Sequence, residues 1–164
     1  MQRLHIRGHV EITGKRMYQT ALLLHVIGAT IWTGGHLVLA CVILPQVLKQ
    51  RDLAFIQRFE NAYEKIGIPA LLVQIITGFY LVAYWLPDES VPGAPTHPAS
   101  WLLLTKVVLL LATAALAADA RLRIIPRLTP ERLPSLAWHI IPVTVISVLF
   151  VIAGVGYRFG WFVW

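Results

Sequence analysis

Four long stretches of this chain contain almost no Asp, Glu, Lys or Arg, and each is long enough to cross a lipid bilayer. A helix needs about 20 residues to span the roughly 30 Å hydrocarbon core. Hydrophobic residues make up 57% of the chain and charged residues 13%, against roughly 45–50% and about 25% in soluble globular proteins. The sequence therefore predicts an all-α, polytopic membrane protein, an antiparallel bundle of four transmembrane helices. The expected spans cover residues 18–44, 66–86, 101–120 and 136–157.

We expect two regions, a basic N-terminal tail at residues 1–17 and a transmembrane domain at residues 18–164. The single cysteine, Cys41, excludes an internal disulfide and a zinc or iron–sulfur centre built from cysteines. The net charge of +6 does not indicate nucleic acid as a partner, because the basic residues lie between apolar runs rather than in a patch. These features exclude a cytosolic enzyme and a secreted disulfide-rich protein.

The connections between the spans differ in composition. We expect Pro45 to end the first helix, because proline disfavours helix continuation. Residues 45–65 have apolar positions at helical spacing, which predicts an amphipathic segment continuous with the second span and bent at Pro69. Residues 87–100 contain four prolines and no Lys or Arg, which predicts a loop.

The distribution of Lys and Arg predicts the orientation. Eight basic residues flank the first and third connections, whereas five lie at the opposite ends of the spans. Because basic residues are enriched on the cytoplasmic side, we expect segments 45–65 and 121–135 to be cytoplasmic, with both termini outside. The basic N-terminal tail argues against this orientation.

Few ionisable or strongly polar groups lie at bilayer depth, and each is a candidate for function because burying it is costly. Two histidines of the first span are eleven residues apart, so they share one helix face with Gly28 and Trp32 between them. We expect Asp119, by contrast, to pair with a nearby arginine at the membrane interface. The candidate binding residues are His25, His36, His139, Lys106, Gln74, Gly28 and Trp32, and the three histidines are the candidate metal ligands.

Depth along the spans sorts these groups into two layers. Because successive spans alternate in direction, His25 is expected to lie level with Lys106, and His36 with His139. Lys106 could extend to the interface, or could remain buried beside a ligand. A buried lysine readily loses its proton, which would free its nitrogen for coordination.

Several short motifs resemble the membrane copper-resistance D (CopD-like) superfamily, a grouping that includes the HemJ-type protoporphyrinogen oxidases. The likeness covers most of residues 17–157. The motifs are Leu24-His25-x-x-Gly28-x-x-x-Trp32-x-Gly34-Gly35, Tyr63-x-x-Ile66-Gly67-Ile68-Pro69-Ala70 with Thr77-Gly78, and Trp101-x-x-x-x-Lys106.

The resemblance implies a four-helix membrane bundle that holds a b-type haem or a copper ion. In the HemJ-type proteins a first-span histidine and a third-span lysine form the functional pair, and they correspond to His25 and Lys106. His36 and His139 depart from that pair and look more like the CopD-type branch. The departure argues against porphyrinogen oxidase activity.

Three functions therefore remain open at this point. The favoured interpretation is a haem b protein with a redox role, an oxidoreductase linked to a membrane quinone or a redox partner protein. Its small residues would form a slot for the flat macrocycle and its histidines would ligate iron. The alternatives are copper handling, for which imidazole suits Cu(II) better than Cu(I), and a structural or assembly subunit without a cofactor.

We expect the lipid bilayer of a bacterial inner membrane as the environment. The chain is expected to act as a homo-oligomer or as a subunit of a larger membrane complex.

Overall fold

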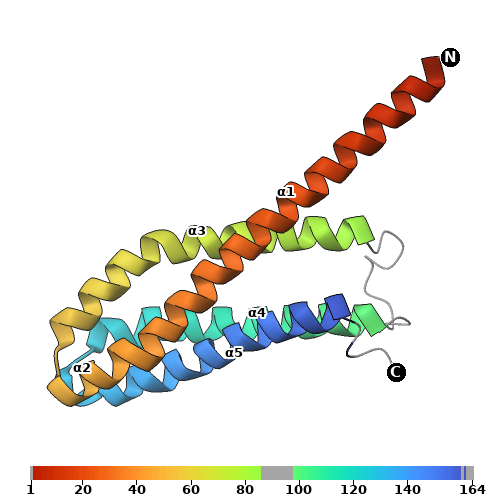
Figure 1. Cartoon of the computed structure of the whole chain (residues 1–164). Helices are drawn as coiled ribbons and strands as arrows, with labels where there is room; N and C mark the ends of the chain where they lie inside the picture. Colours follow the sequence, from red (N-terminus) through yellow and green to blue (C-terminus); the bar gives the residue numbers. More distant parts are fainter. Residues whose placement is uncertain (1, 86–97, 160, 162–164) are drawn as a thin grey trace.

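The computed structural model describes residues 2–85, 98–159 and 161, and these residues form helices and short connections without a strand. Four helical stretches are long and apolar enough to cross a membrane: residues 13–50, 53–84, 100–127 and 130–156. Consecutive long helices run in opposite directions (Figure 1). The helices are α1 (Gln2–Val38), α2 (Leu44–Gln50), α3 (Leu53–Trp85), α4 (Pro98–Asp119) and α5 (Leu133–Phe159).

The first helix does not end at Pro45, which corrects the expected boundary. A π-helical segment, Leu39–Ile43, follows α1 and leads directly into α2. Pro45 lies in the first turn of α2, directly after this wider helical turn. The helix ends instead at Arg51, whose left-handed backbone (φ 54°) reverses the chain.

The second transmembrane helix begins far earlier than residue 66. The Asp52 carboxylate accepts a hydrogen bond from the backbone N–H of Phe55 at 2.9 Å and caps the start of α3. The helix then continues through Pro69 to Trp85, so the amphipathic segment and the span are one element. Figure 1 shows that α3 curves along its first half.

Irregular helix connects α4 to α5. A π-helical segment, Ala120–Ile124, is followed by two single-turn 3₁₀ helices, Ile125–Arg127 and Pro130–Arg132. These turns bring the chain back along α4 with little extended backbone. The loop predicted at 87–100 lies mostly outside the described residues, and its last three positions belong to α4.

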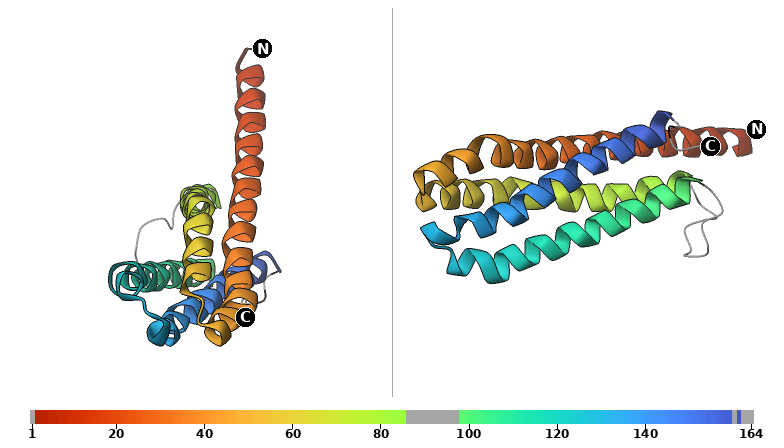
Figure 2. Two further views of the ribbon diagram at one scale, coloured as in Figure 1. Left: turned by 90° about the vertical axis from the view of Figure 1, so that its left-hand side faces the viewer. Right: turned by 90° about the horizontal axis from the view of Figure 1, so that it is seen from below.

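The bundle is built from two closely packed pairs of helices. Helix α1 packs along α3, and α5 packs against both α4 and α1, whereas α3 and α4 make little direct contact. Figure 2 shows this arrangement from two further directions, with the first turns of α1 extending beyond the other helices. The buried apolar core lies at the end of the bundle near α2. It consists of Leu39, Ile43, Leu44, Val47, Ile56, Leu128, Leu133, Leu136 and Ile140.

Candidate functional site

His25 lies on the face of α1 that packs against α3. Its Nδ1 is 3.0 Å from Oγ1 of Thr77. The Thr77 hydroxyl donates to the carbonyl of Val73 at 2.6 Å, so its oxygen is left to accept, and Nδ1 of His25 is the donor. The backbone of Gln74 also accepts a hydrogen bond from the His25 ring. With Nδ1 as the donor, Nε2 carries the lone pair, and the side-chain hydrogen bond to Thr77 does not involve it. A metal-binding histidine is held in the same way, with one ring nitrogen donating and the other free.

Gly78 makes room for this imidazole. A Cβ at position 78 would lie 3.2 Å from Cε1 of His25, so a larger residue would press on the ring. The His25 side chain therefore lies against the backbone of α3, with Thr77 fixing its orientation. The short sequence Thr77-Gly78 performs both tasks on one turn.

Lys106 reaches the same layer from α4. Its Nζ points to α5, where a Cβ added at Gly154 would lie 3.9 Å from it. Lys106 interacts electrostatically with His25. It makes no hydrogen bond or ion pair with a described residue. The histidine and the lysine that depth along the spans places level are thus within electrostatic range of each other.

Gly28 and Gln74 form the crossing of α1 and α3 rather than an open slot. A Cβ at Gly28 would lie 2.8 Å from Cγ of Gln74 and 2.9 Å from the carbonyl oxygen of Ala70. The small residue therefore allows two helices to approach closely, a common use of glycine in membrane bundles. The cofactor-binding role expected for Gly28 stays a prediction.

His36 is 8% exposed and lies in an aromatic cluster, eleven residues further along α1 toward α2 than His25. Its Nδ1 is 2.8 Å from the carbonyl oxygen of Trp32, which can only accept, so Nδ1 is the donor. The Trp32 and His36 rings have centroids 4.4 Å apart, and Tyr63 meets His36 edge-on at 5.6 Å. The hydroxyl of Tyr63 donates to the same Trp32 carbonyl at 2.9 Å.

Tyr63 is the residue of this cluster whose role the sequence does not predict. Its ring fills the space beside Gly35 of α1 and lies near Gly67, one turn further along α3. The glycine at residue 67, four positions after Tyr63, is the signal that could have indicated a ring lying along the helix.

His36 also meets α5, through backbone rather than through His139. Thr144 donates to the carbonyl of His36 at 3.2 Å, and Thr33 donates to the carbonyl of Ser147 at 3.3 Å. The contacts of His36 are thus Trp32 and Tyr63 on its side chain and Thr144 on its carbonyl.

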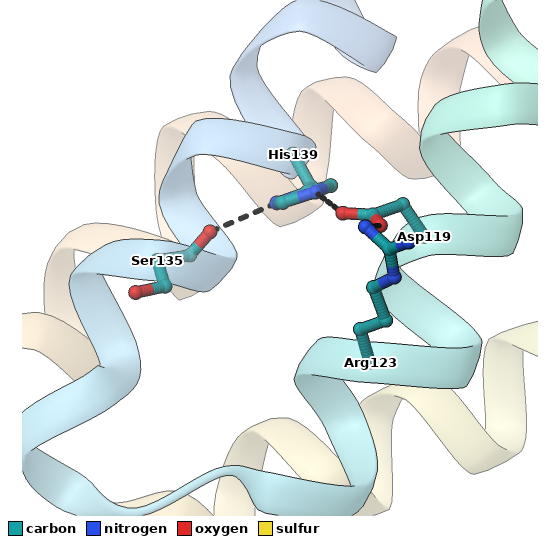
Figure 3. A network of polar contacts seen from close by, with 4 residues as sticks. All are labelled: Asp119, Arg123, Ser135 and His139. Atoms are coloured by element: carbon teal, nitrogen blue, oxygen red, sulfur yellow. Dashed lines mark hydrogen bonds and ion pairs between the residues drawn. The ribbon is translucent and has the colours of Figure 1, made fainter.

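His139 binds elsewhere, as Figure 3 shows. Its Nε2 is 2.8 Å from Oδ2 of Asp119, and its Nδ1 is 2.9 Å from the carbonyl oxygen of Ser135. Both ring nitrogens therefore face oxygen acceptors, and neither offers a free lone pair to a metal. Among the described residues no hydrogen bond joins His139 to His36, and the shared site expected from these two histidines stays a prediction. His139 ties α5 to α4.

Asp119 makes the interfacial ion pair expected for it. Its Oδ1 is 3.1 Å from Nη1 of Arg123, one turn later in the chain. A second ion pair, between Arg121 and Glu64 at 2.8 Å, joins this end of α4 to α3. These charges lie at one end of the bundle, away from His25.

One comparison with known proteins gives a match. The family model described as copper resistance protein D matches residues 55–156, from the start of α3 to the end of α5. The chain belongs to the copper resistance D family. No curated protein and no solved structure matches it.

The match to the copper resistance D family includes Lys106 and His139. It begins after α1, so His25 and His36 lie outside it. The assignment to this family, with four apolar helices, makes the chain an integral membrane protein related to copper resistance.

The donor set bears on which group this family member could hold. Among the described residues no three His, Cys, Asp or Glu side chains gather around one point. Cys41 is exposed on the π-helical segment, far along the helix from His25. Two ring nitrogens of the bundle interior carry a lone pair that no side-chain hydrogen bond uses, Nε2 of His25 and Nε2 of His36. Of the two histidines, His25 is the one that Lys106 influences electrostatically.

Haem does not fit the described residues in the way the sequence suggested. The small residues expected to form the slot are packed against protein atoms: Gly28 against Gln74, Gly67 against Tyr63, and Gly78 against His25 itself. His139 is engaged on both nitrogens. The described residues therefore offer no slot for a haem macrocycle beside His25.

Proposed function

We propose that this chain handles copper as a substrate within the membrane, and that Nε2 of His25 is the nitrogen that binds it. The orientation of His25 carries this proposal. The Nδ1–H bond to Thr77 fixes the ring and leaves the other nitrogen in the interior of the bundle. Membership of the copper resistance D family supports copper as the ion.

A single imidazole suits an ion that passes rather than one that is stored. Conduction requires binding that is strong enough for entry yet weak enough for release. Among the described residues, His25 is not part of a group of three or more His, Cys, Asp or Glu side chains that could hold a metal ion. Imidazole accepts copper readily, whereas the soft sulfur donors that retain Cu(I) are scarce in this chain, with one Cys and two Met.

Lys106 adjusts the strength of this binding in the proposal. When protonated, its ammonium opposes a second positive charge at His25, with which it interacts electrostatically. Copper would therefore bind His25 more weakly than it would without the charge of Lys106. In this proposal Lys106 acts through charge and not as a ligand.

The proposal places the protein in the inner membrane of a bacterial cell, with segments 45–65 and 121–135 on the cytoplasmic side. The count of basic residues supports this orientation. A homo-oligomer, or a place in a larger membrane complex, is compatible with the proposal and is not required by it.

Copper titration of the purified protein in lipid nanodiscs tests the proposal. We expect about one copper ion per chain, and a loss of at least tenfold in affinity for His25→Gln. The matched control is His139→Gln, which should bind copper as the wild type does, because both nitrogens of His139 are engaged. Wild-type affinity in His25→Gln would overturn the proposal.

The same titration defines the role of Lys106. Lys106→Met removes the charge and keeps the length of the side chain, so copper should bind roughly tenfold more tightly. Weaker binding would show instead that the lysine nitrogen is itself a ligand.

A further inference from the structure

The hydroxyl of Thr113 is a buried polar group without a partner. Thr113 lies in the second half of α4 and is 2% exposed. Of the buried side-chain nitrogen and oxygen atoms in the described part of the chain, its Oγ1 is the one that makes no hydrogen bond. Buried hydroxyls in proteins are almost always bonded to protein or to ordered water.

The orientation of Thr113 differs from that of other threonines in these helices. Five of them donate to the carbonyl four residues earlier in their own helix, which satisfies the hydroxyl locally. They are Thr20, Thr30, Thr77, Thr105 and Thr144. Thr113 makes no such bond.

Two further polar groups lie near Thr113 along the contact of α4 with α5. Lys106 precedes it by seven residues, which places both on one face of α4, about 10 Å apart along the axis. The antiparallel pairs Lys106 with Gly154 and Asp119 with His139 put Thr113 level with Ser147. Ser147 is fully buried and donates to the carbonyl of Thr144 at 2.7 Å, so its oxygen can still accept.

We propose that the contact of α4 with α5 holds ordered water, bonded to Thr113 and extending toward Lys106. A hydroxyl and an ammonium both donate, so their shared need is an acceptor, which water supplies. Water also bonds in return to an accepting oxygen such as that of Ser147. A metal cation is disfavoured here, because Thr113 and Ser147 offer only neutral hydroxyl oxygens and no carboxylate, imidazole or thiolate. The water also gives the side chain of Lys106 hydrogen-bond acceptors at bilayer depth.

Replacement of Thr113 by valine tests this site. A contact that holds water and a contact that leaves the hydroxyl unpaired predict opposite changes in melting temperature. Valine has the shape of threonine without the hydroxyl. If water occupies the site, Thr113→Val breaks its hydrogen bonds and the melting temperature in lipid nanodiscs falls, by about 2–4 °C. If the hydroxyl were simply unpaired, the same change would raise the melting temperature.

Thr30→Val is the matched control, since Thr30 is exposed on α1 and bonds its own helix. It should leave the melting temperature nearly unchanged, and Thr113→Ser should retain wild-type stability because it keeps the hydroxyl.

Water contact can also be measured on the wild-type protein in bilayers, which does not depend on any variant folding. Solid-state NMR should show magnetisation transfer from water to Thr113 and Lys106, and much less to Thr30. A rise in melting temperature for Thr113→Val, or no transfer from water to Thr113, would overturn the proposal.

Discussion

Two adjacent glycines of α1 have opposite surroundings, and they show how a single residue decides helix packing. A Cβ at Gly35 would run into the ring of Tyr63, whereas a Cβ at Gly34 would meet nothing within 4 Å. The Tyr63 ring must stay where it is to reach the Trp32 carbonyl. Gly35 is therefore required for close approach, and Gly34 is not.

We predict that Gly35→Ala destabilises the protein by about 1–3 kcal/mol, the usual range for an overpacked contact. The clash would push Tyr63 away from α1 and break its hydrogen bond to Trp32. Unfolding in mixed detergent measures the change in free energy.

Gly34→Ala is the matched control for this experiment. It should be neutral or stabilising by up to about 1 kcal/mol, because alanine favours the helix. Equal effects of the two substitutions would contradict the packing described for Tyr63.

At the scale of residues, the sequence predicts how deep a residue lies along its span better than it predicts which side chain that residue contacts. Counting along alternating spans places Lys106 level with His25, and the structure brings them into electrostatic range. The partner of His139 could not be found in this way, because Asp119 points away from the helix face that Lys106 occupies. Its contact with His139 depends on the relative rotation of α4 and α5, which spacing along one helix does not determine.

At the scale of elements, the π-helical segment before Pro45 explains why the first helix continues. The N–H of Leu44 bonds the carbonyl of Leu39, five residues earlier, which widens the turn directly before the proline. A rule that proline ends a helix assumes a regular α-helix on both sides. Without a signal for the wider turn, the sequence predicts the helix but not its end.

The short helix α2 contributes to a core with α3 and α5, and we predict that this core carries much of the packing energy. Leu136 is 1% exposed within it. Leu136→Ala should cost about 2–5 kcal/mol, because the surrounding side chains cannot fill the cavity completely. The unfolding free energy in mixed detergent measures the loss.

Leu149 provides the control on the same helix. It is 41% exposed, on a surface that faces lipid in the membrane. Leu149→Ala should therefore cost much less than Leu136→Ala. A similar cost for both would mean that the core near α2 does not dominate the packing of α5.

At the scale of the whole molecule, the apolar surface of the long helices is what made the fold predictable. Large side chains such as Ile76 and Leu111 are 68% and 64% exposed, as expected for helices that face lipid. Four such helices require two connections at one end and one at the other. The described connections, at residues 51–52 and 128–129, lie at the same end of the bundle (Figure 1).

The last prediction concerns the orientation of this bundle in the cell. Single cysteines at Arg51 and Arg127, in a Cys41→Ser background, should both react only from the cytoplasmic side with a membrane-impermeant maleimide. A cysteine at Pro92, between the end of α3 and the start of α4, should react from outside. The physical reason is the larger number of Lys and Arg residues near the first two positions, which the positive-inside rule places in the cytoplasm. The ion pairs of Arg121 and Arg123 do not change this expectation, because acidic residues contribute little to the rule. Reaction of all three positions from one side would contradict four membrane crossings, whereas the reverse pattern would preserve the fold and overturn only its orientation.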